Sequence, residues 1–233
     1  MKHFDLLEQK RKHVKFYKED IPPKEKVERA LYKAWKTSPS KNNAMAYQAL
    51  VWGPDKVKEK EAIHGLVVKC HADVEDQAVK DGQATKTQGA KVGVYENPYY
   101  RHVKENPYLI TVHSRIAQPN VYYQKQVETG HFFDQAHESH IEKIIDSVAV
   151  EVGIFIANLT NYLLEEGLDI SYNSCFNRRP HNWHKAGLNM VDTRPIVMMS
   201  CGYAKRYREE DMEEWKIKHE DIKPEMKEII KWI

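Results

Sequence analysis

The chain has 233 residues, of which 41% are hydrophobic and 30% are charged, and its formal net charge at pH 7 is +2. This length suffices for one substantial core, and a charge so near zero gives no reason to expect non-specific binding to nucleic acid. The cysteines (Cys70, Cys175 and Cys201) are too few and too scattered for a disulfide framework, which favours a reducing cytoplasm.

The N-terminal part of the chain predicts helices around one strand. Apolar residues recur at helical spacing from Val27 to Trp35, and Pro23 suits the first turn of that helix. The short apolar run at 48–52 stops at Gly53, which predicts a buried strand. The residues after Met1 include no apolar run of signal-peptide length, so no signal peptide is expected. Further helices are predicted at 3–9 and 55–70.

The loop "TSPSKNNAMAY", residues 37–47, is rich in hydrogen-bonding side chains. Residues such as Ser40 and Asn43 can bond to nearby backbone groups, so an ordinary loop is one interpretation. The other interpretation is a loop that grips a polar, aromatic ligand, because these donors and acceptors lead directly into Met45 and Tyr47.

The middle of the chain is less regular. Residues 72–106 are polar and interrupted by glycine and proline, which predicts helix fragments joined by loops. A second strand is predicted at 107–114. The segment at 116–140 is too irregular for a helix or strand and too aromatic for disorder. We therefore predict an insertion that acts as a lid over a binding site, with packing of its aromatic residues on the core as the alternative.

A long helix within 138–169 is the most informative element. Its apolar residues surround the helix axis, which marks a helix buried on most sides and suggests that a second subunit covers part of it. The apolar stretch at 152–164 contains Asn158, Thr160 and Asn161 and is too short and too polar for a membrane span, so no membrane partner is expected. The apolar positions are Val148, Val152, Ile154, Phe155, Ile156, Leu159 and Leu163.

The C-terminal part predicts two more strands. One is expected at 168–173, and the run at 194–204 shows no polar alternation, so a strand buried on both faces is expected there. The tail from Glu209 is charged and ends in an amphipathic segment at 226–233. Strands that alternate with helices predict one domain, residues 1–233, of α/β or α+β class with a covered sheet.

Two basic groups along the chain suit a phosphate dianion. Arg offers a planar fork of donors and Lys a point charge, and loops at strand ends often hold ligands. No glycine-rich phosphate motif is present, so any phosphate must be held by side chains. The alternative for each group is a solvated surface. The first group comprises Lys10, Arg11, Lys12, His13 and Lys15, and the second Lys205, Arg206 and Arg208.

Three other patterns could form a metal site, a ligand site or a catalytic nucleophile. The histidines within 131–140 could bind a metal, but a chain with 12 histidines clusters them easily, and we predict no metal. The segment 177–184 could take an anionic or stacking ligand, although a surface loop with Trp183 tucked onto the core is the favoured interpretation. Cys175 lacks a base fixed beside it in sequence, which disfavours a nucleophile.

These pieces, in this order, resemble the nitroreductase family of flavin enzymes. The stretch "RKHVKFY" is similar to the family's Arg-x-Ser-x-Arg/Lys-x-Phe segment, with His13 in place of serine. "PSKNNAMAY" matches the family's Pro-Ser-x-x-Asn, while Met-Ala-Tyr replaces the Gln-Pro-Trp that follows. "EVGIFIANLTNYLLEEGLD" looks like the central dimer helix, and "RPIVMMSCGYA" resembles the last core strand. The resemblance covers most of the chain except 72–105 and 116–140.

The resemblance implies a mostly antiparallel sheet flanked by helices, and an intertwined homodimer with FMN at the interface. It also implies that a hydride passes from NAD(P)H through flavin N5 to an electrophilic acceptor such as a nitroaromatic, a quinone or a flavin. FMN then carries the chemistry, so no catalytic side chain is expected, and the segment at 116–140 would cover the exposed flavin face. The alternative is a flavin-binding protein that stores or senses flavin without turnover.

The resemblance also implies which residues surround FMN. The phosphate would be held by both basic groups, Arg11, Lys12, His13 and Lys15 with Lys205, Arg206 and Arg208. The partner subunit would supply residues of the loop after the first long helix, namely Pro39, Ser40 and Asn43. The flavin ring near N5 would lie against the segment after the strand at 168–173, namely Asn173, Ser174 and Cys175.

Overall fold

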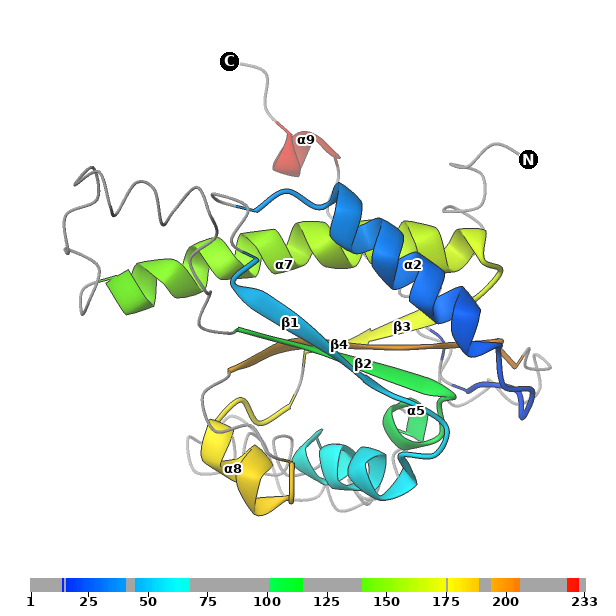
Figure 1. Ribbon diagram of the computed structural model, residues 1–233. Helices are drawn as coiled ribbons and strands as arrows, with labels where there is room; N and C mark the ends of the chain where they lie inside the picture. Colours follow the sequence, from blue (N-terminus) through cyan, green and yellow to red (C-terminus); the bar gives the residue numbers. More distant parts are fainter. Residues whose placement is uncertain are drawn as a thin grey trace, which may run out of the picture.

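An antiparallel sheet of four strands, ordered β1-β2-β4-β3, forms the middle of the molecule. In this computed structural model, helices α2 and α7 cover one face of the sheet, and α5, α8 and a helix at 57–67 lie on the other (Figure 1). The strands are β1 (Tyr47–Trp52), β2 (Tyr108–Ser114), β3 (Asp169–Asn173) and β4 (Pro195–Gly202). The helices are α2 (Lys24–Thr37), α5 (Arg101–Lys104), α7 (His140–Glu165), α8 (Pro180–Lys185) and α9 (Met226–Ile229). The predicted α+β class with a covered, antiparallel sheet is confirmed.

The structure describes residues 14, 16–40, 45–67, 101–114, 140–174, 176–188, 194–205 and 226–230. Three predicted features therefore fall wholly or mostly outside the described residues. The helix at 3–9 lies wholly outside them. Only 101–106 of the polar segment at 72–106 is described, and only residue 140, the start of α7, of the insertion at 116–140.

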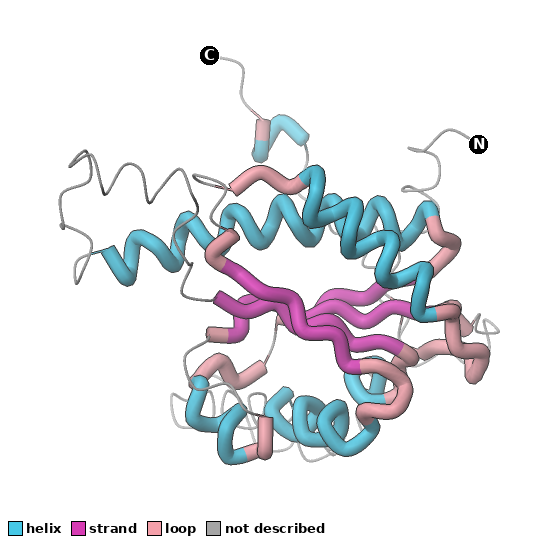
Figure 2. The backbone as a smooth tube through the Cα atoms, viewed as in Figure 1, coloured by secondary structure: helices cyan, strands magenta, loops and turns pink. Residues whose placement is uncertain are grey.

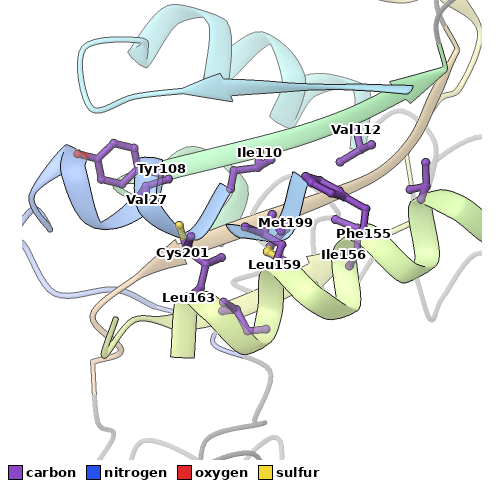
Figure 3. Close-up of a cluster of buried hydrophobic side chains, with 14 of the residues drawn as sticks. Val27, Tyr108, Ile110, Val112, Phe155, Ile156, Leu159, Leu163, Met199 and Cys201 are labelled. Atoms are coloured by element: carbon purple, nitrogen blue, oxygen red, sulfur yellow. The ribbon is translucent and has the colours of Figure 1, made fainter. Parts of the chain in front are cut away.

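The inner strands β2 and β4 divide their side chains between two cores. In β2, Ile110 and Val112 lie in the core beneath α2 and α7 (Figure 3). Leu109 belongs to the core on the α8 side. In β4, Met199 lies in the first core and Met198 in the second, and both are almost fully buried. The prediction that this strand is buried on both faces is confirmed.

Among the described strands, β1 lies at the edge of the sheet and pairs with β2 alone (Figure 2). Tyr47 is buried, but the following residues are partly exposed and Val51 is 42% exposed. The strand predicted at 48–52 is therefore confirmed, but its predicted burial is wrong. A short apolar run has the same appearance in an inner strand and in an edge strand, so the sequence alone could not separate them.

Helix α2 begins directly after Pro23, as predicted, and lays one face on the core. Val27, Ala30 and Ala34 follow at helical spacing and are at most 1% exposed. Trp35 does not share that face, because it is 55% exposed. Small residues on the buried side let α2 lie close to α7, against which it packs (Figure 1).

Helix α7 is 26 residues long and is the spine of the larger core. Among the positions expected to surround its axis, Ile154 is 37% exposed, and Val150, outside that set, is 65% exposed. The helix is therefore apolar on a face that the described part of the chain leaves uncovered. The remaining predicted positions are buried, namely Val148, Val152, Phe155, Ile156, Leu159 and Leu163.

One stretch of α7, Val148–Glu165, is long and apolar enough to cross a membrane by length and composition alone. The expectation that this region is too short and too polar is wrong on that criterion. The helix nevertheless packs on the sheet, with 44% of the stretch buried within the chain. Core helices of soluble proteins meet the same criterion.

Two helices end in the same glycine-dependent cap. After α7, Gly167 has φ +79° and the N–H of Leu168 bonds back to the carbonyl of Leu163 at 2.9 Å. After α8, Gly187 has φ +77° and an equivalent bond ends the helix. These are Schellman caps, which need a left-handed residue and therefore favour glycine.

Helix α8 corrects one prediction. A surface loop was expected at 177–184, but residues 180–185 are helical, with Pro180 in the first turn. Trp183 is fully buried, so its predicted position on the core is confirmed. A helix this short gives no sustained periodicity in sequence.

Candidate functional site

The N-terminal segment lies against the end of β4. Tyr17 forms an isolated antiparallel bridge with Ala204. On either side of this bridge, the Lys18 N–H donates to the Tyr203 carbonyl at 2.8 Å and the Lys205 N–H donates to the Phe16 carbonyl at 2.9 Å. Segments from the two ends of the chain thus meet at one corner of the sheet.

The side chain of Tyr17 is buried under this corner and is 9% exposed. Its hydroxyl lies 2.9 Å from Ser200 Oγ and donates to the Ser200 carbonyl at 3.1 Å. Burial raises the pKa of Tyr17 well above its ordinary value, so the phenol is neutral and acts here as a hydrogen-bonding group.

Other elements converge on the same corner. Asp169, at the start of β3, accepts a hydrogen bond from the Ala204 N–H at 2.9 Å. Lys26 of α2 donates to the Glu166 carbonyl at 2.9 Å and to the Tyr203 hydroxyl at 3.3 Å. Asp169 of β3 thus holds the backbone after β4, while Lys26 links α2 to the residue after α7 and to the side chain of Tyr203.

The corner bears directly on the two predicted basic groups. Lys205 is exposed there, and its backbone pairs with Phe16, which directly follows Lys15 in the chain. The structure thus places Phe16, the residue that follows the first group in the chain, beside Lys205 of the second group. The other predicted phosphate ligands lie outside the described residues, namely Arg11, Lys12, His13, Lys15, Arg206 and Arg208.

The loop after α2 uses its polar residues locally. Ser40 Oγ accepts a hydrogen bond from the Met45 N–H at 3.0 Å, and Asn158 of α7 donates to Ser38 Oγ at 3.0 Å. Met45 adopts φ 49°, a left-handed conformation that is uncommon outside glycine and costs energy. Pro39 and Ser40 thus belong to a loop tied to α7, whereas Asn43 lies outside the described residues.

The segment after β3 is tied to β4 and to the following turn. Asn173 is buried and Ser174 is exposed, while Cys175 lies outside the described residues. Arg178 donates to the Ser174 carbonyl at 2.9 Å and to the Ile196 carbonyl at 3.5 Å. Sequence reasoning did not identify this arginine as an anchor, because its partners are backbone carbonyls that carry no sequence signal.

The predicted site residues fall at opposite ends of the sheet. Tyr47 pairs with Ser114 and Asn173 with Met198, so the loop after α2 and the segment after β3 leave the sheet at the end where β4 begins. The corner with Lys205 lies past the other end of β4. Since β4 has 8 residues, the two groups are separated by roughly 26 Å of strand at about 3.3 Å per residue.

The histidines within 131–140, an alternative metal site, lie almost wholly outside the described residues. Within the described part of the chain, no group of His, Cys, Asp or Glu could hold a metal ion. The residues of that cluster lie outside this part, except for the backbone of His140 at the start of α7.

The protein family of the chain follows from a match to a family model. A model of the Nitroreductase family matches residues 9–203, which include all four strands and the N-terminal side of the corner and end one residue before Ala204. The chain belongs to the nitroreductase family. The predicted family resemblance is thereby confirmed. A search of curated proteins gave no match.

Solved structures similar to this nitroreductase-family protein share its fold. A BluB-like flavoprotein from Clostridium difficile 630 has a TM-score of 0.63 and 18% identity, covering 100% of this chain and 99% of that one. Oxidized iodotyrosine deiodinase bound to FMN and 3-iodo-L-tyrosine has a TM-score of 0.56 and 19% identity, covering 89% and 92%. A Staphylococcus epidermidis protein assigned as an NAD(P)H:FMN oxidoreductase has a TM-score of 0.55 and 15% identity, covering 90% and 93%. At such identities the likeness shows the fold alone.

Proposed function

We propose that this protein is an FMN-dependent oxidoreductase that passes a hydride from NAD(P)H through flavin N5 to an electrophilic acceptor such as a nitroaromatic, a quinone or a flavin. Its membership of the nitroreductase family supports the flavin-dependent class. One structural observation carries the proposal for this chain, namely the pairing of Phe16 with Lys205, which brings the residue after the first basic group beside a residue of the second.

The residues present fit the phosphate of FMN. Lys205 is exposed at the corner, and cationic side chains bind a phosphate dianion through charge-assisted hydrogen bonds. The hydroxyl of Tyr17, the carboxylate of Asp169 and the ammonium of Lys26 are already engaged in holding the backbone. The residues that would hold the phosphate are Arg11, Lys12, His13 and Lys15 with Lys205, Arg206 and Arg208.

We propose a site shared between two chains, as in the assembly that the family resemblance implies. A second copy would supply the loop residues from across the interface, so we propose a homodimer in which Pro39, Ser40 and Asn43 belong to the subunit opposite. The uncovered apolar face of α7 supports the same assembly, because exposed apolar area of this kind marks protein interfaces.

The flavin ring is proposed to lie against the segment after β3. Ser174 is exposed there, and Arg178 fixes its carbonyl, which limits movement of this segment toward a ring. When bound, FMN supplies the capacity to accept and donate a hydride, so the protein is required to position it and needs no acid or base of its own. We propose that Asn173, Ser174 and Cys175 set this position, and that the enzyme works in the cytoplasm.

A spectroscopic experiment tests the proposal. The purified protein is expected to be yellow, to release FMN on denaturation, and to bleach when NADH or NADPH is added without oxygen. A protein that binds FMN but is not reduced by either nicotinamide would support flavin storage or sensing instead. A protein that binds no flavin would contradict both.

A double variant tests the basic segment. Arg11→Ala with Lys15→Ala is expected to weaken FMN binding by about 3–6 kcal/mol, since each charge-assisted bond contributes about 1.5–3 kcal/mol. Replacing Lys18 and Lys24, which are exposed cations outside the basic segment, by alanine provides the matched control. Unchanged affinity of the Arg11 and Lys15 variant for FMN would remove the N-terminal group from the site.

A further inference from the structure

Tyr17 stands close to both basic groups. In the chain it follows Lys15 by two residues, and its backbone partner, Ala204, directly precedes Lys205. Any shift of Tyr17 along or away from β4 therefore changes the position of one basic segment relative to the other.

The ring of Tyr17 is fitted against Gly202 at the end of β4. A Cβ at position 202 would lie 2.8 Å from Tyr17 Cδ1 and equally close to the ring of Pro107, a distance that real Cβ atoms do not show. A glycine is thus required for this approach. The aromatic ring and the hydroxyl, which is bonded to Ser200, fix Tyr17 at successive points along β4.

The pairing needs this support for two reasons. Short two-stranded pairings are marginally stable in water on their own, and this bridge involves a single residue on each side. The segments that it joins also carry like charges, which repel one another in the absence of an anion. The buried side chain of Tyr17 offsets both costs.

We propose, on the basis of the function proposed above, that Tyr17 is a positioning residue for the phosphate of FMN. It holds the segment that carries Lys15 in register with the segment that carries Lys205. Its hydroxyl is buried and bonded to Ser200, so it acts through the backbone and makes no contact with the phosphate itself.

The test compares FMN with riboflavin, which lacks the phosphate. Tyr17→Phe keeps the ring and removes the hydroxyl, so the fold is retained. We expect the preference for FMN over riboflavin to fall roughly fivefold, the effect of one hydrogen bond, with riboflavin affinity unchanged. Trp52→Phe is the matched control, because it removes a bond of 2.9 Å to Thr111 elsewhere on the sheet and is expected to leave the preference intact.

A second pair of variants disturbs the ring. Gly202→Ala is expected to abolish most of the preference for FMN by displacing Tyr17, whereas Gly65→Ala, which meets no atom within 4 Å, is expected to preserve it. If Gly202→Ala does not fold, Tyr17→Phe still decides the question.

The outcomes separate the two proposals. Wild-type protein that prefers FMN, with a Tyr17→Phe variant that keeps the full preference or weakens both flavins equally, would overturn the positioning role alone. Wild-type protein that binds neither flavin would overturn the proposed function. A loss of preference in Tyr17→Phe but not in Trp52→Phe supports both.

Discussion

The two faces of the sheet are built from different chemistry. On the side of α2 and α7 the core is mainly apolar, and the apolar character continues onto the outer face of α7 at Val150 and Ile154. On the side of α8 the buried layer includes ionisable groups, of which His113 and Lys60 are 0% and 3% exposed. The stability of the α7 side therefore depends on what covers its outer face. The stability of the α8 side depends on the protonation of its buried groups.

The two buried ionisable groups on the α8 side, Lys60 and His113, differ in their hydrogen bonding. Lys60 donates to the Asn106 carbonyl at 2.7 Å, and burial lowers its pKa. His113 packs edge-on against Trp183 with ring centroids 5.1 Å apart. Among the described residues, neither ring nitrogen of His113 has a hydrogen-bond partner. Burial alone lowers the pKa of His113 to about 3, so the ring is neutral in the folded protein.

The largest effect is expected from a charge on the α7 face. Ile154→Glu places a carboxylate where we propose that a second copy packs, and an unpaired charge in an apolar interface is strongly unfavourable. Sedimentation at micromolar concentration is expected to show loss of the dimer. Val57→Glu, at a site 52% exposed on the other side of the sheet, is the control and is expected to remain dimeric. A wild-type protein that sediments as a stable monomer would contradict the comparison.

A second effect concerns acid. The pKa of His113 is about 3 when folded and about 6.5 when unfolded, so the unfolded chain binds the extra proton between these values and stability falls as pH drops through this window. Lowering the pH from 7.5 to 5 is expected to cost about 2 kcal/mol through this residue. Denaturant titrations at both pH values measure the loss.

His113→Leu sharpens that prediction. The substitution removes the titrating ring from the buried layer and is expected to reduce the loss between pH 7.5 and 5 by about 2 kcal/mol. His184→Gln changes a histidine that is exposed on α8 and serves as the control. An identical pH dependence in the wild type and His113→Leu would exclude His113 as the source.

The smallest effect compares two glycines. Gly65 and Gly153 are both helical, and an added Cβ at either meets no atom of this chain within 4 Å. Alanine at 65 is expected to stabilise the fold by about 0.5–1 kcal/mol through helix propensity. Alanine at 153, beside Ile154 on the outer face of α7, is expected to give less than this gain and to weaken the dimer. Equal gains in thermal unfolding, with no change in dimer affinity, would show that nothing packs closely on that face.

Long elements could be predicted from sequence because their patterns are long. Helix α7 is apolar around most of its axis and strand β4 lacks polar alternation, and the structure packs both elements into the core. The edge position of β1 could not be predicted, since only the order of strands decides which apolar run lies outermost. Trp35 was counted with the buried stripe of α2 because a helical pattern near its end tolerates an extra apolar residue, and the structure exposes it.

The candidate site was predictable only in composition. The basic character of both segments is visible in the sequence, but the hydrogen bonds of Tyr17 to Ser200 join positions 183 residues apart. No local pattern specifies a contact at that separation. The polar loop at 37–47 shows the opposite limit, because the local bonding that the sequence allows for Ser40 is what the structure shows, and its role toward a ligand stays a prediction.

The strand order has a consequence for how the chain is made. Both β2 and β3 pair with β4, which is the last strand of the sheet to be synthesised, and the segment around Tyr17 also waits for residues 200–204. A nascent chain that ends before β4 therefore holds β3 without the strand that it pairs with in the described part of the chain, and the N-terminal segment without its docking surface. Strand edges exposed in this way promote association with other chains. Translation must thus reach about residue 205 before the sheet closes, so the corner around Tyr17 forms only after the rest of the sheet has been made.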